Sequence, residues 1–332
     1  MAASAIAQER FTAAIFDASF DSLPDKTQVW IGQPGSREEG LGRLNMLTPD
    51  VVAKAASEIR TGRRTALNWD LQKLEYPLFG RQPCQHTISP VLDGLFFDDV
   101  YEFNPQAGSQ WDGLRHMQKT INGTGEQRFY GGVTVEEVLD RSNDRIGIHH
   151  WAKEGIAGRG VLIDYASWAE KKGLKYSVFT NHTVKIEEIQ EIVKESKITF
   201  QKGDILLIRI GLTREWDTLS EQRKQTFGAN LESPSAGVEA TEDVLRFIWD
   251  NQIAAVAGDA IGWEVLPPID FGPNFLHPTL LAGWGMPIGE MFDLEELSRI
   301  CKEEGRWTFF LSSSPLNMRG GISSPPNCMA VF

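Results

Sequence analysis

The sequence predicts an α/β fold built as one large domain. Three short apolar runs rich in Val and Ile are bounded by glycine and charged residues, as buried strands are: Gly160–Tyr165, Asp204–Gly211 and Ile253–Asp259. Helical patterns lie between and ahead of these runs, and this alternation is typical of α/β proteins. The 332 residues, 41% of them hydrophobic, suffice for a large core, and no repeat or linker divides the chain.

Further elements follow from the same patterns. Leu95–Phe103 and Trp307–Ser312 are two more candidate strands. A helix is expected over Thr48–Arg60, because Thr48 suits the N-cap and Pro49 the first helical position. Its apolar stripe comprises Val51, Val52, Ala55, Ala56 and Ile59. Three further helices are expected at Val184–Ser196, Val238–Asn251 and Phe292–Glu303. In the second, the residues expected to face inward are Val244, Leu245, Ile248 and Trp249. In the third, the apolar residues at helical spacing are Phe292, Leu294, Leu297 and Cys301.

Composition excludes several classes of function. The formal net charge of −12 and the scattered lysines and arginines argue against a nucleic-acid partner, which needs a clustered basic surface. No apolar run is long enough for a membrane span, and the N-terminus lacks the pattern of a signal peptide. Three cysteines without a CxxC pair fit a reducing compartment, so we expect a cytoplasmic protein with a small-molecule substrate.

The first candidate site lies in the polar segment 106–116. Asp112 and His116 are four residues apart, which places both on one helix face or around a tight loop. Either geometry offers a carboxylate oxygen and an imidazole nitrogen to a divalent metal. The alternative from spacing alone is an aspartate that caps a helix and a histidine that packs on its surface.

A second candidate site contains His277 and Glu290. Residues 266–288 show no clear helix or strand period, and loops of that length inside a compact domain tend to be functional. The alternative is a buried structural histidine and a glutamate at the start of a helix. Asp259 and Glu264 follow the strand Ile253–Asp259, where they either line the site or serve as loop and capping acids.

Both segments resemble one known family, the cyclase-like metal-dependent hydrolases that include bacterial kynurenine formamidase (arylformamidase) and isatin hydrolase. Family members carry H-x-G-T-H-x-D-x-P-x-H and, later, a His–apolar–Gly–apolar–Glu segment. This chain matches the first motif at Gly108, Asp112 and His116, and the second at His277 and Glu290. The intervening GVLIDY, KGDILLIRIG and IAAVAGDAIGWE and the C-terminal SSPPNCMAVF also look like the family.

The resemblance runs from about Phe97 to the end of the chain. It implies a swivelling β/β/α arrangement for residues 91–332, the hydrolase domain. Residues 1–90 look like an N-terminal extension packed on that domain, as in a subgroup with a QWDxxxH core. The resemblance also favours a homo-oligomer, a dimer or larger.

The resemblance implies one divalent ion, manganese or zinc, with Asp112, His277 and Glu290 as its ligand core. His116 would be a further ligand or the proton-transfer base. Gln106 and Gln110 stand where the family has two histidine ligands. An amide oxygen binds hard cations but is a poor zinc ligand, so we expect Gln110 to be a weak ligand or a donor that orients the substrate carbonyl.

The resemblance therefore implies hydrolysis of a C–N or C–O acyl bond, as in an amide, formamide, lactam or lactone. A rival interpretation is a non-catalytic descendant that binds a small ligand, since both motif histidines are replaced. Aromatic residues near the motifs either line an apolar pocket or belong to the core: Phe96, Phe97, Trp111, Trp263 and Trp284. His149 and His150 are expected to be structural, or one of them replaces a lost ligand; His86 and His182 read as surface residues.

Overall fold

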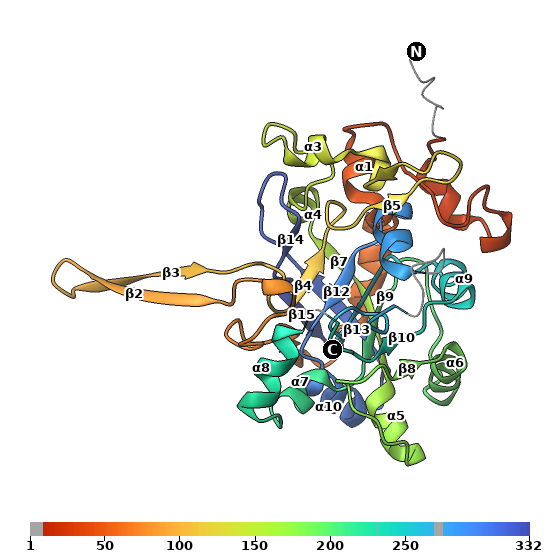
Figure 1. Ribbon diagram of the computed structural model, residues 1–332. Helices are drawn as coiled ribbons and strands as arrows, with labels where there is room; N and C mark the ends of the chain where they lie inside the picture. The colour runs from red at the N-terminus through yellow and green to blue at the C-terminus, as the bar shows by residue number, and fades with distance from the viewer. Residues whose placement is uncertain (1–8, 231, 269–274) are drawn as a thin grey trace.

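The protein is described here by a computed structural model covering residues 9–230, 232–268 and 275–332. In these residues a nine-stranded mixed sheet forms the centre of an α/β domain (Figure 1), which confirms the predicted fold class. The strands lie in the order β1 (Arg64–Ala66), β15 (Cys328–Val331), β13 (Thr308–Ser313), β7 (Ile156–Asp164), β9 (Ile205–Arg209), β11 (Ala255–Gly258), β12 (Ile288–Glu290), β4 (Gln110–Asp112) and β14 (Ser323–Ser324).

The middle of the sheet is parallel. β7 pairs with β9, β9 with β11 and β11 with β12, all in parallel, whereas the outer strands are antiparallel. Parallel strands are covered on both faces, so their sequences are apolar without alternation. Every residue of β9 and β11 is buried, and the predicted strands at Gly160–Tyr165, Asp204–Gly211, Ile253–Asp259 and Trp307–Ser312 are confirmed.

Ten α-helices occur in the described residues, and most surround the sheet. They are α1 (Arg37–Leu41), α2 (Pro49–Ala55), α3 (Val135–Leu139), α4 (His149–Glu154), α5 (Tyr165–Lys172), α6 (Ile186–Glu195), α7 (Leu212–Trp216), α8 (Glu221–Ala229), α9 (Glu242–Asp250) and α10 (Glu295–Glu304). The predicted helices at 184–196, 238–251 and 292–303 correspond to α6, α9 and α10. The four inward residues predicted for α9 are all buried, as are those around α10.

The helix predicted at 48–60 is shorter than expected. Thr48 caps it by accepting the backbone N–H of Val51, and Pro49 is its first residue, as predicted. The α-helix ends at Ala55, and a 3-10 turn (Ala56–Glu58) follows. The tighter turn breaks the 3.6-residue period, so Ala56 and Ile59 are exposed and the predicted stripe is wrong at those two positions.

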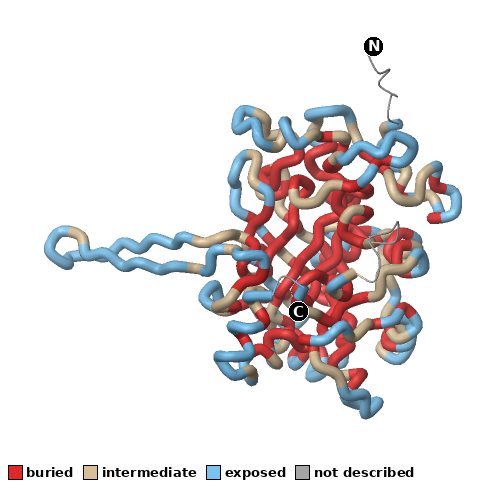
Figure 2. Tube along the Cα trace, viewed as in Figure 1, coloured by how far each residue is buried: buried red, intermediate tan, exposed pale blue. Residues whose placement is uncertain are grey.

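The candidate strand Leu95–Phe103 forms β3 (Phe96–Glu102) but does not join the central sheet. It pairs with β2 (Gln85–Val91) in a hairpin that projects from the body, and nearly all of the hairpin is exposed (Figure 2). The predicted strand is therefore confirmed, but it lies outside the central sheet and is exposed. Its aromatic and branched residues favour an extended backbone, but that preference does not tell whether a partner surface covers the strand.

Residues 9–90 share the sheet and the core of the rest of the chain. β1 pairs with β15, and Trp30 and Leu67 lie in the same apolar cluster as residues of β7 and β13. The division at residue 90 between extension and hydrolase domain stays a prediction. Within the described residues, no helix combines the length and apolar character needed to cross a bilayer.

Candidate metal centre

Two paired strands present polar side chains on one face of the sheet. In β4, Gln110 and Asp112 face one side, while Trp111 between them packs edge-on against Phe292 at 5.1 Å in the core. β12 runs antiparallel beside β4 and places Glu290 opposite Gln110. Gly289 is required next to Glu290, because a Cβ atom there would lie 2.6 Å from the Cβ of Ala257. Tight packing behind the strands thus fixes the three polar groups in front.

His277 reaches the same place from the start of a π-helix (Pro278–Gly283) that precedes β12. Its Nδ1 donates to Glu264 Oε2 at 2.7 Å, and its backbone N–H donates to Glu264 Oε1 at 3.0 Å. Glu264 is fully buried and therefore fixes the orientation of the ring. A carboxylate behind a ligating imidazole is a common support in metal sites, because it leaves Nε2 facing the ion.

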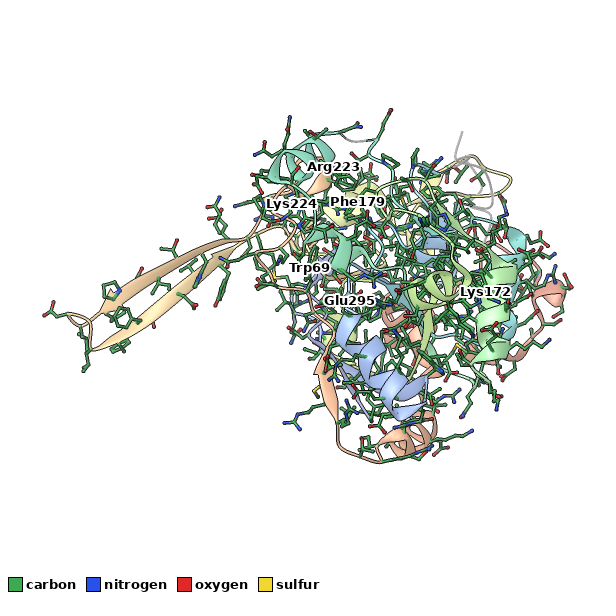
Figure 3. The ribbon with its side chains drawn as sticks, turned by 90° about the horizontal axis from the view of Figure 1, so that it is seen from below. Trp69, Lys172, Phe179, Arg223, Lys224 and Glu295 are labelled. Carbon is green, nitrogen blue, oxygen red and sulfur yellow. The ribbon has the colours of Figure 1, made fainter. Side chains whose placement is uncertain are left out.

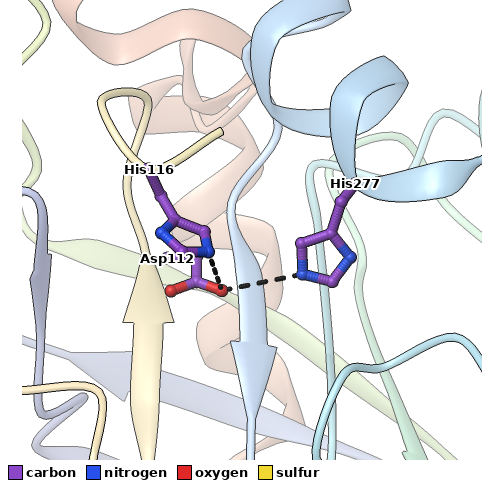
Figure 4. A group of neighbouring side chains, drawn as sticks. All are labelled: Asp112, His116 and His277. Atoms are coloured by element: carbon purple, nitrogen blue, oxygen red, sulfur yellow. Dashed lines mark ion pairs between the residues drawn. The ribbon is translucent and has the colours of Figure 1, made fainter. Parts of the chain in front are cut away.

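The ligand atoms converge, as Figure 4 shows for Asp112, His116 and His277. Asp112 Oδ2 lies 3.7 Å from His277 Nε2 and 3.8 Å from His116 Nε2, and one donor atom from each residue lies within 4.8 Å of the other two. Atoms that share one ion are roughly 3–4 Å apart, given bonds of about 2.0–2.2 Å. Glu290 Oε1 is 3.0 Å from His277 Nε2.

Two buried oxygens support this assignment. Asp112 Oδ2 and Gln110 Oε1 make no hydrogen bond with any described residue, although both are inaccessible to solvent. Buried polar atoms are rarely left without a partner, because each costs about 1–3 kcal/mol. The residues present therefore fit a cation.

The electrostatics point the same way. Asp112, Glu264 and Glu290 are three buried carboxylates within one cluster. Burial and the neighbouring charge of Asp112 raise the pKa of Glu290 to about 7. Burial alone would lower the pKa of His277, but the charge of Glu264 and the hydrogen bonds with its acidic neighbours hold it well above the usual value. Such a concentration of buried negative charge favours a bound cation.

On the β4 side, the glutamine amides determine the hydrogen-bonding pattern. Gln106 Nε2 donates to Asp112 Oδ1 at 2.9 Å and to His116 Nδ1 at 3.0 Å. The reverse orientation of the Gln106 amide would place its oxygen against the carboxylate of Asp112. The carboxylate therefore determines which way the amide points. Since Nδ1 accepts, neutral His116 carries its proton on Nε2. Burial lowers the pKa of His116 despite the opposing effect of Asp112, which favours that neutral form.

A cavity of about 690 Å³ opens beside these residues. His116, His277 and Glu290 lie in its wall, and Arg81 is the permanently charged cation among the described residues that line it. Arg81 also donates to the backbone oxygen of Gln106 at 2.9 Å. Most of the remaining wall is apolar: Leu78, Phe79, Met117, Ile261, Leu266 and Phe275.

The structure brings together all the residues singled out from the sequence at this site, namely Gln106, Gln110, Asp112, His116, His277 and Glu290. Asp112 ends a strand and His116 follows in a tight loop, so the helix-capping alternative does not apply. Glu264 was left open as a site or capping acid, and it lies in the site. Asp259 is a capping acid, because it accepts the backbone N–H groups of Ile210, Gly211 and Leu212.

Other candidates lie elsewhere. His149 and His150 lie in α4 with their ring centroids 4.2 Å apart and the rings tilted by 45°, and neither belongs to the metal-binding group found among the described residues. His86 is exposed as expected, but His182 is partly buried and stacks on Tyr176. Trp111, Trp263 and Trp284 are core residues, and Phe96 and Phe97 lie on the hairpin, so none of the predicted aromatics lines the cavity. Residues 269–274, part of the predicted functional loop, lie outside the described residues.

Arg81 was missed at this site. Its guanidinium lies in the cavity wall, but it precedes the polar motif by 25 residues and carries no motif signal of its own. Only the three-dimensional arrangement places it near Asp112.

The comparisons with known proteins agree with this fold. A crystal structure described as a novel cyclase is 27% identical, covers 90% of this chain and 97% of its own, and has a TM-score of 0.77. Isatin hydrolase A from Ralstonia solanacearum is 14% identical, with 81% of this chain and 92% of that chain covered and a TM-score of 0.57. Isatin hydrolase A from Labrenzia aggregata is 15% identical, with 86% and 98% covered and a TM-score of 0.56. The two isatin hydrolases share the fold at these identities. No curated protein matches the chain.

A family model described as "Putative cyclase" matches residues 25–265. The match includes Gln106, Asp112 and His116, and it begins well before Phe97, where the sequence resemblance was expected to start. On this match, together with the shared fold, the chain belongs to the cyclase family.

Proposed function

We propose that the protein is a metal-dependent hydrolase that cleaves a C–N or C–O acyl bond in a small substrate with an apolar or aromatic part. The observation that carries this proposal is the convergence of Asp112, His277 and Glu290 at the wall of a largely apolar cavity. Membership of the cyclase family and the unpartnered oxygen of Asp112 support it.

Asp112, His277 and Glu290 would hold the ion, manganese or zinc, with Gln110 Oε1 as a weak additional oxygen donor. When bound, such an ion lowers the pKa of a coordinated water and polarises a carbonyl oxygen. Glu264 would keep His277 in the tautomer that offers Nε2, through the 2.7 Å hydrogen bond. Gln110 Nε2 binds Glu290 Oε2 at 2.6 Å and so holds that carboxylate in place.

His116 would orient the reacting groups rather than bind the ion. Gln106 occupies its Nδ1, so the Nε2–H of the neutral ring is free to donate a hydrogen bond to the leaving nitrogen or oxygen. The hydroxyl of water adds to the acyl carbon as the bond to the leaving atom breaks, and the proton of that water ends on the leaving atom, so that a carboxylic acid and an amine or alcohol result. The apolar wall of the cavity would hold the body of the substrate and exclude water from it.

The test combines metal content with turnover. Purified protein should take up about one Mn²⁺ or Zn²⁺ per chain in calorimetry, and should hydrolyse at least one member of a panel of N-formyl aromatic amines, cyclic imides and aryl lactones. His116→Gln should keep the metal and lose turnover by about 100-fold or more. Failure of the wild type to bind either metal would overturn the proposal and favour a small-ligand binding protein. Loss of metal in His116→Gln would instead make His116 a ligand.

A further inference from the structure

The segment that leads to Arg81 is anchored on two helices. Glu75 accepts hydrogen bonds from Trp216 Nε1 in α7 at 2.9 Å and from Lys224 Nζ in α8 at 3.0 Å. Phe79 then turns the backbone with a φ of 61°, a left-handed conformation that residues other than glycine rarely adopt. Such conformations persist where the surroundings hold them, and they cluster at functional sites. Directly after this turn, Arg81 lies in the wall of the cavity beside the candidate metal centre.

Arg81 has no carboxylate partner among the described residues. Its hydrogen bond to them runs from Nη1 to the backbone oxygen of Gln106 at 2.9 Å, and its Cζ lies 5.1 Å from the ring centre of Phe79. The buried guanidinium of Arg209, by contrast, binds Asp164 at 2.6 Å. A guanidinium carries five N–H groups, so most of those on Arg81 remain available to a ligand in the cavity.

The composition of the cavity wall narrows the chemistry of that ligand. Arg81 is the only lysine or arginine among the described residues that line the cavity, and most of the others are apolar. A neutral substrate that filled the cavity would remove water from the guanidinium and leave its charge without a partner, which costs free energy. A substrate with one anionic group supplies that partner. A second negative charge would find no second cation in this wall.

Arg81 is also close enough to the candidate metal centre for one small molecule to reach both. Gln106, which accepts the hydrogen bond from Arg81, donates from Nε2 to Asp112 Oδ1 at 2.9 Å. Gln106 therefore bridges the guanidinium and the carboxylate of Asp112. Burial and the charge of Asp112 raise the pKa of Glu290, and the charge of Arg81 opposes that rise. The cation thus acts on the ligand side of the cavity.

We propose that Arg81 binds a carboxylate of the substrate and makes the protein specific for acyl compounds that carry one. This inference rests on the proposed hydrolase function and adds a substrate class to it. The planar guanidinium offers parallel N–H groups to a carboxylate, a geometry that a lysine does not reproduce. With the carboxylate at Arg81, the acyl bond lies at the candidate metal centre, and the apolar wall contacts the body of the molecule.

Calorimetry on the full chain tests the recognition of charge. The probes are phenylacetate and phenylacetamide, which share a ring and differ in charge. Dialysis against a chelator first removes any ion that could bind the carboxylate. In Arg81→Met, the ratio of the affinity for phenylacetate to that for phenylacetamide should fall about tenfold or more, because a hydrogen bond between charged groups is lost. The affinity for phenylacetamide should stay at the wild-type value.

Arg223→Met is the matched control, because it changes the net charge by the same amount. Arg223 is exposed on α8 (Figure 3) and does not line the cavity, so the affinity ratio should remain that of the wild type. Arg81→Lys should recover part of the ratio, since it restores the charge without the planar fork. An unchanged ratio in Arg81→Met would overturn the proposal. An equal loss for both probes would also overturn it, because Arg81 would then only shape the wall.

Turnover separates carboxylate binding from a role at the reacting carbonyl. The substrates are formanilide and para-formamidobenzoate, which differ only in the carboxylate. Arg81→Met should raise KM for para-formamidobenzoate about tenfold or more, with kcat and both constants for formanilide near the wild-type values. An equal loss of kcat on both substrates would make Arg81 a stabiliser of the developing oxyanion and overturn the proposal. A wild type that hydrolyses neither compound but shows the expected affinity ratio supports carboxylate recognition and counts against the hydrolase function alone.

Discussion

The two sides of the candidate metal centre are built from different chemistry. On the side of β12, His277 and Glu290 face the centre and Glu264 supports the imidazole from behind. On the side of β4, Asp112 is the single charged donor, and the amides of Gln106 and Gln110 occupy its other oxygen. The comparison teaches that two of the three candidate ligands, His277 and Glu290, lie on the β12 side and one, Asp112, lies on the β4 side. The β4 amides mainly hold Asp112 and His116 in position.

The largest effect is expected from Asp112→Ala. It removes the donor that lies between His277 and His116, and it leaves one amide N–H of Gln106 without its acceptor. Metal affinity should fall by more than about 100-fold, and turnover should disappear. Calorimetry with Mn²⁺ and Zn²⁺ measures the loss. A variant that keeps wild-type affinity would place the ion elsewhere.

Glu264→Gln should weaken metal binding on the β12 side without removing a ligand. The neutral amide no longer stabilises the ring of His277 in the same orientation, so metal affinity should fall about 10- to 100-fold. Glu232→Gln is a suitable control, because Glu232 lines the same cavity but is exposed and makes no contact with His277. Equal effects of the two changes would show that Glu264 acts only through its charge in the cavity.

Metal affinity should also depend on pH. The folded-state pKa of Glu290 is raised to about 7, so below that pH the carboxyl group is protonated and the ion must displace a proton. Apparent affinity should therefore increase with pH, by about tenfold per unit for each displaced proton. The increase should continue above pH 7, because the pKa of His277 is held well above its usual value and that ligand must also lose a proton. Competition titrations between pH values on both sides of 7 measure the slope. A flat profile would show that Glu290 is not a ligand.

The smallest effects are expected at Gln110. Gln110→Ala should keep the ion and reduce affinity by less than about tenfold, because the three charged or imidazole ligands remain. Gln110→His restores a nitrogen donor two residues from Asp112 and should raise zinc affinity relative to manganese. If Gln110→Ala loses the ion as fully as Asp112→Ala, Gln110 is a primary ligand and the β4 amides do more than hold Asp112 and His116 in position.

The sequence predicted much of the fold because buried parallel strands and capped helices carry local signals. An apolar run such as Asp204–Gly211 is typical of a buried strand. Thr48-Pro49 marks a helix start, because threonine suits the N-cap and proline the first helical position. The projecting hairpin of β2 and β3 was not predicted, because a strand on a projecting hairpin and a strand in a sheet have the same local preferences. Burial depends on residues far away in the chain.

The site was predicted in part, on the strength of the motif. Asp112 and His277 are 165 residues apart, and only the sheet order places β12 beside β4. Arg81 was missed because its role depends entirely on that arrangement. The role of Gln106 in orienting His116 could not be predicted either, since it follows from which amide atom faces Asp112.

Three tryptophans tie residues 18–30 to the rest of the chain. Trp30 Nε1 donates to Ala282 O, Trp249 Nε1 to Ala18 O and Trp284 Nε1 to Lys26 O. Each indole bridges residues 18–30 and the core formed by later parts of the chain. Detachment of that segment would expose three tryptophans to water at once. Intrinsic fluorescence therefore reports whether residues 18–30 are docked, without any label.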